Sequence, residues 1–238
     1  MAALLSATLL PSACSRDPQP NADTSAIATE VREGIVTVSG DDRISDTLTW
    51  RVPAVVIAED GVASARKRAA AALAADDLYA SADTAVPLYL ALSARLPADA
   101  AVTAGLRGAL ARVIVQGDAA LKLSDDDIGA LRDARQLAAV ARAVDENAAT
   151  VQAYLQRVDR ADQLWELNRQ GDLALLSGDL GEQRGGALAH FRAALALRPK
   201  QPRALQGVAA VESAMIRRAE DVSARSDFVA AKRWLAFA

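Results

Sequence analysis

The stretch Gly178–Pro199, GDLGEQRGGALAHFRAALALRP, decides the fold of this chain. Its turn, its apolar helix positions and its closing proline recur 102 positions earlier, in a register without a gap. The matched pairs are Asp77 with Asp179, Leu78 with Leu180, Ala85 with Ala187, Tyr89 with Phe191, Pro97 with Pro199, and Gly105 with Gly207. A register that holds over this length indicates an internal repeat.

The composition favours helices. Hydrophobic residues make up 52% of the chain but aromatic residues only 4%, because alanine and leucine, two strong helix formers, supply most of the apolar count. β-branched and aromatic residues, which favour sheets, are sparse beyond residue 60. We therefore expect residues 60–238 to be helical, with no sheet. No basic block is interleaved with aromatic residues, which argues against nucleic acid as a partner.

Residues 1–14 have the pattern of a targeting segment. Ala2–Leu10 is an apolar run of signal-peptide length, too short to cross a bilayer as a helix. Pro11-Ser12-Ala13-Cys14 follows, and small residues before a lone cysteine resemble the lipobox of bacterial lipoproteins. The resemblance implies that Cys14 is lipidated, so that the chain would touch a membrane only through this anchor, and Ser15 then favours the outer membrane. The alternative is an ordinary secretory signal in which Cys14 is incidental.

Residues 15–59 have the composition of a flexible linker, with prolines and small polar residues in the first part. Within it, Gly34–Val38 is a candidate short strand. Thr47–Ile57 is a candidate extended segment that packs on the first helix, and Pro53 restricts it to a sheet edge or to no sheet at all.

Beyond residue 60 the apolar period becomes helical. The expected helices span 63–75, 85–96, 99–123, 128–144, 148–176, 187–197, 202–225 and 229–237. Pro97 ends the second of them, because the residue before a proline is pushed out of the helical region. Asp125-Asp126-Asp127 is expected to cap the helix that starts at Ile128.

A second alignment supports the repeat. Gln116–Leu121 reads QGDAAL and Gln170–Leu175 reads QGDLAL, at a spacing of 54. Combined with the spacing of 102, it places a middle unit 48 positions after the first. The sequence thus predicts three units of about 48–54 residues and part of a fourth.

These units resemble the tetratricopeptide repeat. Gly171 matches that family's small first-helix position, and Gly178-Asp179 matches its turn between the two helices. The second helix matches at Ala187, Phe191, Ala194, Leu195 and Pro199. The middle unit departs from the pattern, since Asp145 replaces the proline, and the units exceed the family's usual length. The resemblance covers about residues 60–238 and implies antiparallel helical hairpins stacked as an α-solenoid with a concave groove.

A second resemblance concerns the layout of the chain. An imperfect lipobox, a tether and alanine-rich repeats with Trp165-Glu166-Leu167-Asn168 are similar to the N-terminal region of some large bacterial envelope proteins. Those proteins end in a domain like the sulfatase-modifying factor, or formylglycine-generating enzyme. No motif of that catalytic domain is present here, so no catalytic residue is carried over.

The sequence shows no catalytic constellation. His190 is the only histidine and has no cysteine or carboxylate at metal-ligand spacing, so we interpret it as a surface or helix-edge residue. Asp125-Asp126-Asp127 lacks the alternating ligands of a calcium loop, which favours the capping interpretation. We expect no enzyme activity, no cofactor and no metal site.

One helix face is a candidate for partner binding. Glutamines and acidic residues recur along the helix that starts at Ala148, opposite an apolar face that contains Val151, Tyr154, Val158, Ala161 and Trp165. The polar stripe consists of Gln152, Gln156, Asp159, Gln163, Glu166 and Gln170. In tetratricopeptide repeats the first helices line the groove, which favours this stripe as a binding surface. The alternative is a plain solvated face.

Three functions remain open at this stage. The first is a non-catalytic scaffold that binds a protein or peptide at the bacterial cell envelope. The second is the N-terminal repeat region of a larger envelope enzyme whose sulfatase-modifying-factor-like domain lies beyond residue 238. The third is a structural lipoprotein that self-associates through repeat ends or long helices, and the apolar segment 229–238 is the candidate repeat end. As the final helix of a solenoid, that segment would lack a polar outer face, so it is expected to associate or to fray.

Overall fold

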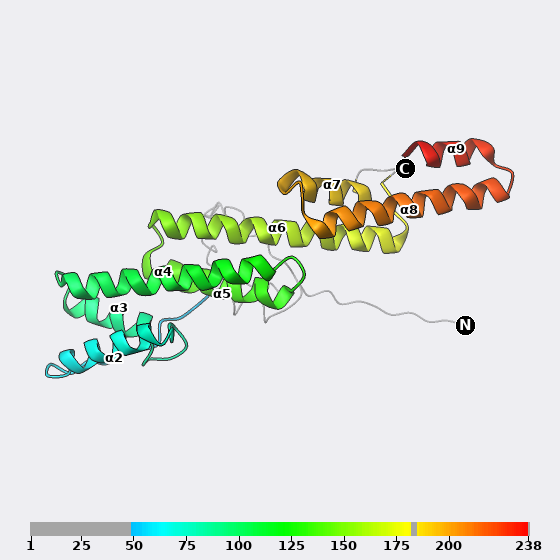
Figure 1. Ribbon diagram of the computed structural model, residues 1–238. Helices are drawn as coiled ribbons and strands as arrows, with labels where there is room; N and C mark the ends of the chain where they lie inside the picture. Colours follow the sequence, from blue (N-terminus) through cyan, green and yellow to red (C-terminus); the bar gives the residue numbers. More distant parts are fainter. Residues whose placement is uncertain (1–48, 182–184, 238) are drawn as a thin grey trace, which may run out of the picture. The chain divides into compact units, whose positions relative to one another are not determined.

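The structure, a computed structural model, describes residues 49–181 and 185–237 (Figure 1). These residues contain eight α-helices and no strand. The helices are α2 (Val62–Ala74), α3 (Ala85–Arg95), α4 (Ala100–Leu123), α5 (Ile128–Asp145), α6 (Ala149–Ser177), α7 (Ala187–Leu197), α8 (Pro202–Ala224) and α9 (Phe228–Phe237). The all-helical prediction is confirmed for this part of the chain, and each helix end lies within a residue of its predicted position. The signal segment, Cys14 and the candidate strand Gly34–Val38 lie outside the described residues.

The repeat seen in the sequence is also a repeat of backbone structure. Gly178 ends α6 at a φ of +78°, and Asp76, 102 positions earlier, follows α2 at +56°. In the next residue, the N–H of Asp77 donates to the carbonyl of Ala72 at 3.0 Å, and the N–H of Asp179 donates to Ala174 at 2.9 Å. The carbonyls of both aspartates accept from the first residue of the following helix, at 3.0 and 2.9 Å. Both copies therefore make the same turn between their two helices.

Aspartate side chains stabilise the turns at both ends of α5. Asp127 caps α5 by accepting a hydrogen bond from the N–H of Gly129 at 2.7 Å, which confirms the predicted capping role. At the other end of α5, Asp145 accepts from the N–H groups of Asn147 and Ala148, both at 3.1 Å. An aspartate can thus replace the proline of the other units, because its side chain stabilises the turn into α6.

The residues before α2 form an extended segment without a sheet partner. Ile57 is buried, and Trp50 and Val55 pack against the same core as α2 and α3. Arg95 at the end of α3 donates a side-chain hydrogen bond to the carbonyl of Ile57. Pro53 is expected to restrict this segment to a sheet edge or to no sheet, and the structure shows no strand in these residues.

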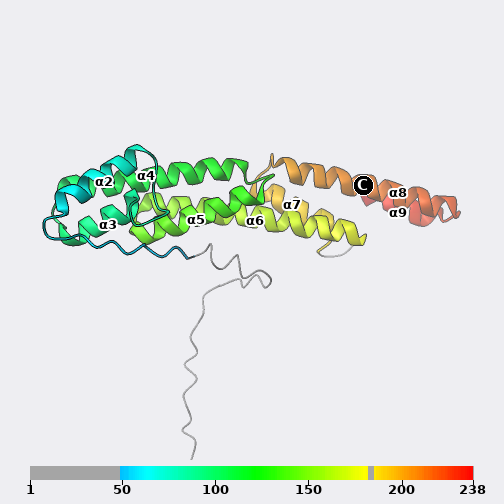
Figure 2. The same ribbon diagram turned by 90° about the horizontal axis from the view of Figure 1, so that it is seen from below.

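The described residues bury two apolar cores, and α6 contributes to both. The N-terminal half of α6 places Tyr154 and Val158 in a core with α2–α5, whereas Leu164 begins a second core with α7 and α8. Helices that are neighbours in the chain make the most extensive contacts. Among the long helices, α4 also contacts α6, and α6 also contacts α8. Figures 1 and 2 show α6 running from beside α4 and α5 to beside α7 and α8.

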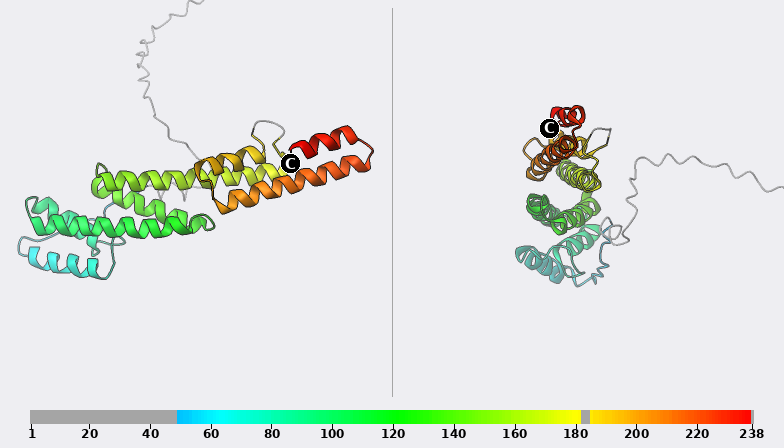
Figure 3. Two further views of the ribbon diagram at one scale, coloured as in Figure 1. Left: turned by 45° about the horizontal axis from the view of Figure 1, so that its top comes forward. Right: turned by 90° about the vertical axis from the view of Figure 1, so that its right-hand side faces the viewer.

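Alternate helices are joined by arginine–aspartate ion pairs. These pairs are Arg66–Asp99 and Arg112–Asp76 between the α2 and α4 segments, Arg157–Asp118 between α6 and α4, and Arg203–Asp172 between α8 and α6. All are partly exposed, and such pairs contribute only about 0–1 kcal/mol each. Each pair connects two helix segments that are separated by one helix in the chain order. The layering of these helices can be followed in Figure 3.

The last helix leaves much of its apolar surface exposed. Phe228, Val229, Leu235 and Phe237 are exposed, whereas Trp234 packs on the second core with Arg218 at 5.7 Å from its ring centroid. The expected association or fraying of this segment stays a prediction. No helix in the described ranges has both the length and the apolarity that crossing a membrane requires.

Candidate functional site

The repeated Gln-Gly-Asp sequence places a glycine where an aromatic ring of another helix packs closely against it. In its first copy, Gly117 of α4 faces the ring of Tyr154 from α6, and a Cβ atom at this glycine would lie 1.9 Å from the phenolic oxygen. Tyr154 is fully buried, and its hydroxyl donates to the carbonyl of Ala134 at 2.7 Å. Burial, together with the nearby charge of Asp118, raises the pKa of the Tyr154 hydroxyl, which therefore stays protonated as a donor.

The aspartate of this sequence joins the same two helices. Both oxygens of the Asp118 carboxylate accept from Arg157 of α6, at 2.9 and 3.0 Å. The Arg157 guanidinium also lies 5.6 Å from the centre of the Tyr154 ring. We call the line along which α4 and α6 meet, at Gly117 and Asp118 of α4 and Tyr154 and Arg157 of α6, the α4–α6 seam.

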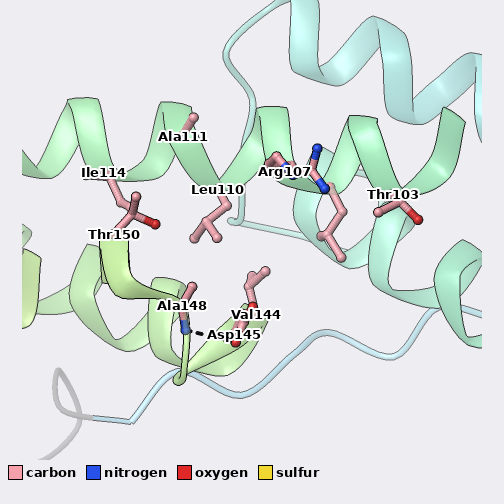
Figure 4. Close-up of a pocket in the computed structure, with 10 residues that line it drawn as sticks. Thr103, Arg107, Leu110, Ala111, Ile114, Val144, Asp145, Ala148 and Thr150 are labelled. Carbon is pink, nitrogen blue, oxygen red and sulfur yellow. Dashed lines mark hydrogen bonds between the residues drawn. The ribbon is translucent and has the colours of Figure 1, made fainter. Parts of the chain in front are cut away.

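A mainly apolar cavity of about 540 Å³ lies at one end of the seam (Figure 4). Residues from α4, the end of α5 and the start of α6 line it: Thr103, Leu106, Arg107, Leu110, Ala111, Ile114, Val144, Asp145, Ala148 and Thr150. Leu110 and Val144 extend from facing helices into the space between them. Asp145 is engaged in the turn described above, whereas Arg107 is exposed and has no ion pair within the described residues. We call this site the apolar cavity.

A second cavity, of about 450 Å³, lies at the other end of the seam. It is lined by Asp118, Leu121, Lys122, Ser124, Arg157, Arg160, Ala161, Leu164 and Arg198. Two of its four cations are paired, Arg157 with Asp118 and Arg198 with Asp125. Lys122 and Arg160 are exposed and take part in no ion pair among the described residues. We call this site the basic cavity.

Part of the lining of the two cavities comes from equivalent positions in successive units. At the spacing of 54 that relates the two Gln-Gly-Asp sequences, Thr103 corresponds to Arg157, Leu106 to Arg160, Arg107 to Ala161, Leu110 to Leu164 and Val144 to Arg198. Thr103, Leu106 and Val144 of the apolar cavity thus correspond to arginines in the basic cavity. One leucine is retained in each, at Leu110 and Leu164, and both are buried.

The predicted polar stripe lies on a different face of α6 from the cavity-lining residues. Gln152, Gln156, Asp159 and Gln163 are exposed, and the half-buried Glu166 and Gln170 are joined by a hydrogen bond of 2.8 Å. A hydrogen bond from Arg169 holds the pKa of the Glu166 carboxyl below its usual value. None of the six residues lines either cavity. Their role in partner binding stays a prediction.

Two further titratable residues, His190 and Asp162, lie outside both cavities. His190 is partly exposed on α7. In the part of the chain that the structure describes, no three histidine, cysteine, aspartate or glutamate side chains are grouped so that they could hold a metal ion. A partly buried pair joins Asp162 to Arg135 at 2.7 Å, and burial raises the pKa of the Asp162 carboxyl against the effect of this arginine.

Sequence reasoning missed the residues that line the two cavities. The signal was present in the spacing of 54, which pairs Thr103 and Leu106 with Arg157 and Arg160. What the spacing could not show is that α4 and α6 lie side by side, since this depends on the contact between Gly117 and Tyr154. No model of a known protein family, no curated protein and no solved structure matches this chain.

Proposed function

We propose that this chain is a non-catalytic scaffold that binds a protein or peptide at the bacterial cell envelope, with its hairpins stacked as a tetratricopeptide-like α-solenoid. The observation that carries the proposal is the α4–α6 seam, with a cavity at each end formed by successive long helices. Stacked helical repeats bind extended ligands along concave surfaces.

The chemistry of the two cavities favours binding over catalysis. Their potential acids and bases are engaged in structure: Asp145 caps a turn, Asp118 is held by Arg157, and the Ser124 hydroxyl donates to the carbonyl of Leu121 at 2.8 Å. The remaining polar groups are cations and threonine hydroxyls, which bind and orient but do not form a nucleophile–base pair.

Photo-crosslinking in cells tests the proposed function. A photoreactive residue at Ala111, which is exposed and lines the apolar cavity, should form a discrete cross-linked adduct with one or a few proteins. A second probe at Gln156 tests the polar stripe. The matched control is a probe at Ala94 of α3, which is exposed and lines neither cavity. Equal labelling at Ala94 and at both test positions would contradict a defined binding surface.

The envelope location rests on Cys14 and is tested separately. If Cys14 is lipidated, Cys14→Ser should move the protein from the membrane fraction to a soluble or unprocessed form. Unchanged fractionation, with cleavage at another position, would favour the ordinary secretory signal and would leave the scaffold proposal standing.

A further inference from the structure

We infer that the partner segment bound at the α4–α6 seam carries apolar side chains next to a cluster of carboxylates. The inference rests on the proposed function and specifies the chemistry of its ligand. The apolar side chains would enter the apolar cavity, and the carboxylates would pair with the cations of the basic cavity.

The apolar cavity has the size and lining of a side-chain pocket. Its volume of about 540 Å³ falls within the usual range of ligand sites, about 300–1,000 Å³. Leu106, Leu110, Ile114 and Val144 supply aliphatic surface, and covering such surface is favourable in proportion to its area. A partner side chain of leucine or isoleucine type would remove this surface from water without burying a polar group.

The basic cavity is selective for negative charge. Arg157 and Arg198 already have carboxylate partners within the chain, but Lys122 and Arg160 do not. Two unpaired cations that line one cavity favour a segment with at least two acidic side chains and disfavour a basic one. Arg107 at the apolar cavity adds a third unpaired cation along the same seam.

The two cavities are close enough for one short segment. On α4, Ile114 of the apolar cavity and Asp118 of the basic cavity are one helical turn apart, about 6 Å. The whole line from Thr103 to Lys122 measures about 28 Å at 1.5 Å per residue. An extended segment rises about 3.3 Å per residue, so about nine residues would reach from end to end.

Selection from a peptide library is the direct test. The probe is a displayed library of random peptides about twelve residues long, which exceeds the span of the seam, selected against the full chain. The enriched peptides should contain two or more aliphatic residues next to two or more acidic residues. Enriched peptides of another chemistry would overturn this inference but not the proposed function. A library that yields no binder would contradict the proposed function itself.

Matched variants then locate the binding. Arg160→Glu should weaken binding of an enriched peptide at least about tenfold, the factor that corresponds to 1.4 kcal/mol. Arg132→Glu on α5 makes the same charge change at an exposed residue outside both cavities and should have no effect. A peptide with lysines in place of its acidic residues should bind Arg160→Glu better than it binds the original chain. Equal losses in the two variants, or no rescue, would overturn the inference.

The apolar end needs its own variant. Ala111→Glu puts a carboxylate beside the apolar cavity on an exposed helix position and should also weaken binding about tenfold or more. Ala119→Glu, on the same helix but outside both cavities, is the control. If the cavity variants instead change the mass of the protein in sedimentation equilibrium, the seam is occupied by a second copy of this chain, and the inference is wrong.

Discussion

The two copies related by the spacing of 102 share their buried contacts and differ on their surfaces. In the first copy Tyr89 packs against Gly105, and in the second Phe191 packs against Gly207 in the equivalent place. The turn between the paired helices has the same backbone hydrogen bonds in both. Close contact between an aromatic ring and a glycine therefore sets how the helices cross, while the exposed faces are free to change.

The difference between the copies lies at the first helix. Phe191 contacts a second glycine, Gly171 of α6, whereas the position equivalent to Gly171 in the first copy is Ala69, which is buried. The ring is correspondingly more enclosed in the second copy, since Phe191 is 0% exposed and Tyr89 is 7% exposed. The second copy should thus depend more strongly on its aromatic residue.

The largest expected effect comes from removing that residue. Phe191→Ala should lower the free energy of unfolding by about 3–5 kcal/mol, because it leaves a cavity between three helices. Tyr89→Ala should cost less, since its ring contacts one glycine and is slightly exposed. Urea denaturation followed by circular dichroism measures both. A larger loss for Tyr89→Ala would show that enclosure of the ring does not explain the difference.

A smaller loss is expected from a methyl group placed at the α4–α6 seam. Gly117→Ala would bring a Cβ atom to 1.9 Å from the Tyr154 hydroxyl oxygen, and the buried tyrosine would have to move. Overpacking of this kind costs about 1–3 kcal/mol, which the better helix propensity of alanine only partly offsets. Unchanged stability in urea, with the Tyr154 hydrogen bond retained, would contradict this account of the seam.

The helices were predictable because their signals are local. Proline, glycine and the apolar period fix their ends, and the spacing of 102 shows that α3 and α7 are equivalent. The cavities were not predictable in the same way. The polar stripe was predicted from the sequence of α6 alone. The apolar cavity is formed by α4, the end of α5 and the start of α6, and the basic cavity is formed by α4, α6, Ser124 and Arg198. Which faces of two long helices meet depends on the fit of Tyr154 to Gly117, and no pattern within one helix reveals that fit.

A stabilising change is expected at a glycine that makes no close contact. A Cβ atom at Gly108 of α4 would meet only Leu73, at 3.6 Å, which is ordinary van der Waals contact. Gly108→Ala should therefore raise the free energy of unfolding by about 0.5–1 kcal/mol through lower backbone entropy in the unfolded chain. It is the matched control for Gly117→Ala, because both change the same helix. A loss of stability in both variants would mean that α4 tolerates no added methyl group, whatever lies opposite.

The smallest effect concerns the caps of the two equivalent helices α4 and α8. Asp99 caps α4 by accepting from the N–H groups of Val102 and Ala101, at 3.0 and 2.9 Å, whereas Gln201 caps α8 in the matching position. The hydrogen bond from Val102, with those from Ala101 and the pairing with Arg66, lowers the pKa of the Asp99 carboxyl. A carboxyl whose pKa is lower in the folded than in the unfolded state contributes stability at pH values above its unfolded pKa, and this contribution is lost as the pH falls through the folded pKa.

Asp99→Asn keeps a capping side chain but does not titrate. The native chain should therefore resist urea better than the variant at about pH 5, and the difference should shrink towards about pH 2.5. Gln201→Ala removes the uncharged cap of α8 and should instead lower stability by the same amount at both pH values. A difference between native and Asp99→Asn chains that stays constant with pH would show that the charge of Asp99 plays no part in capping α4.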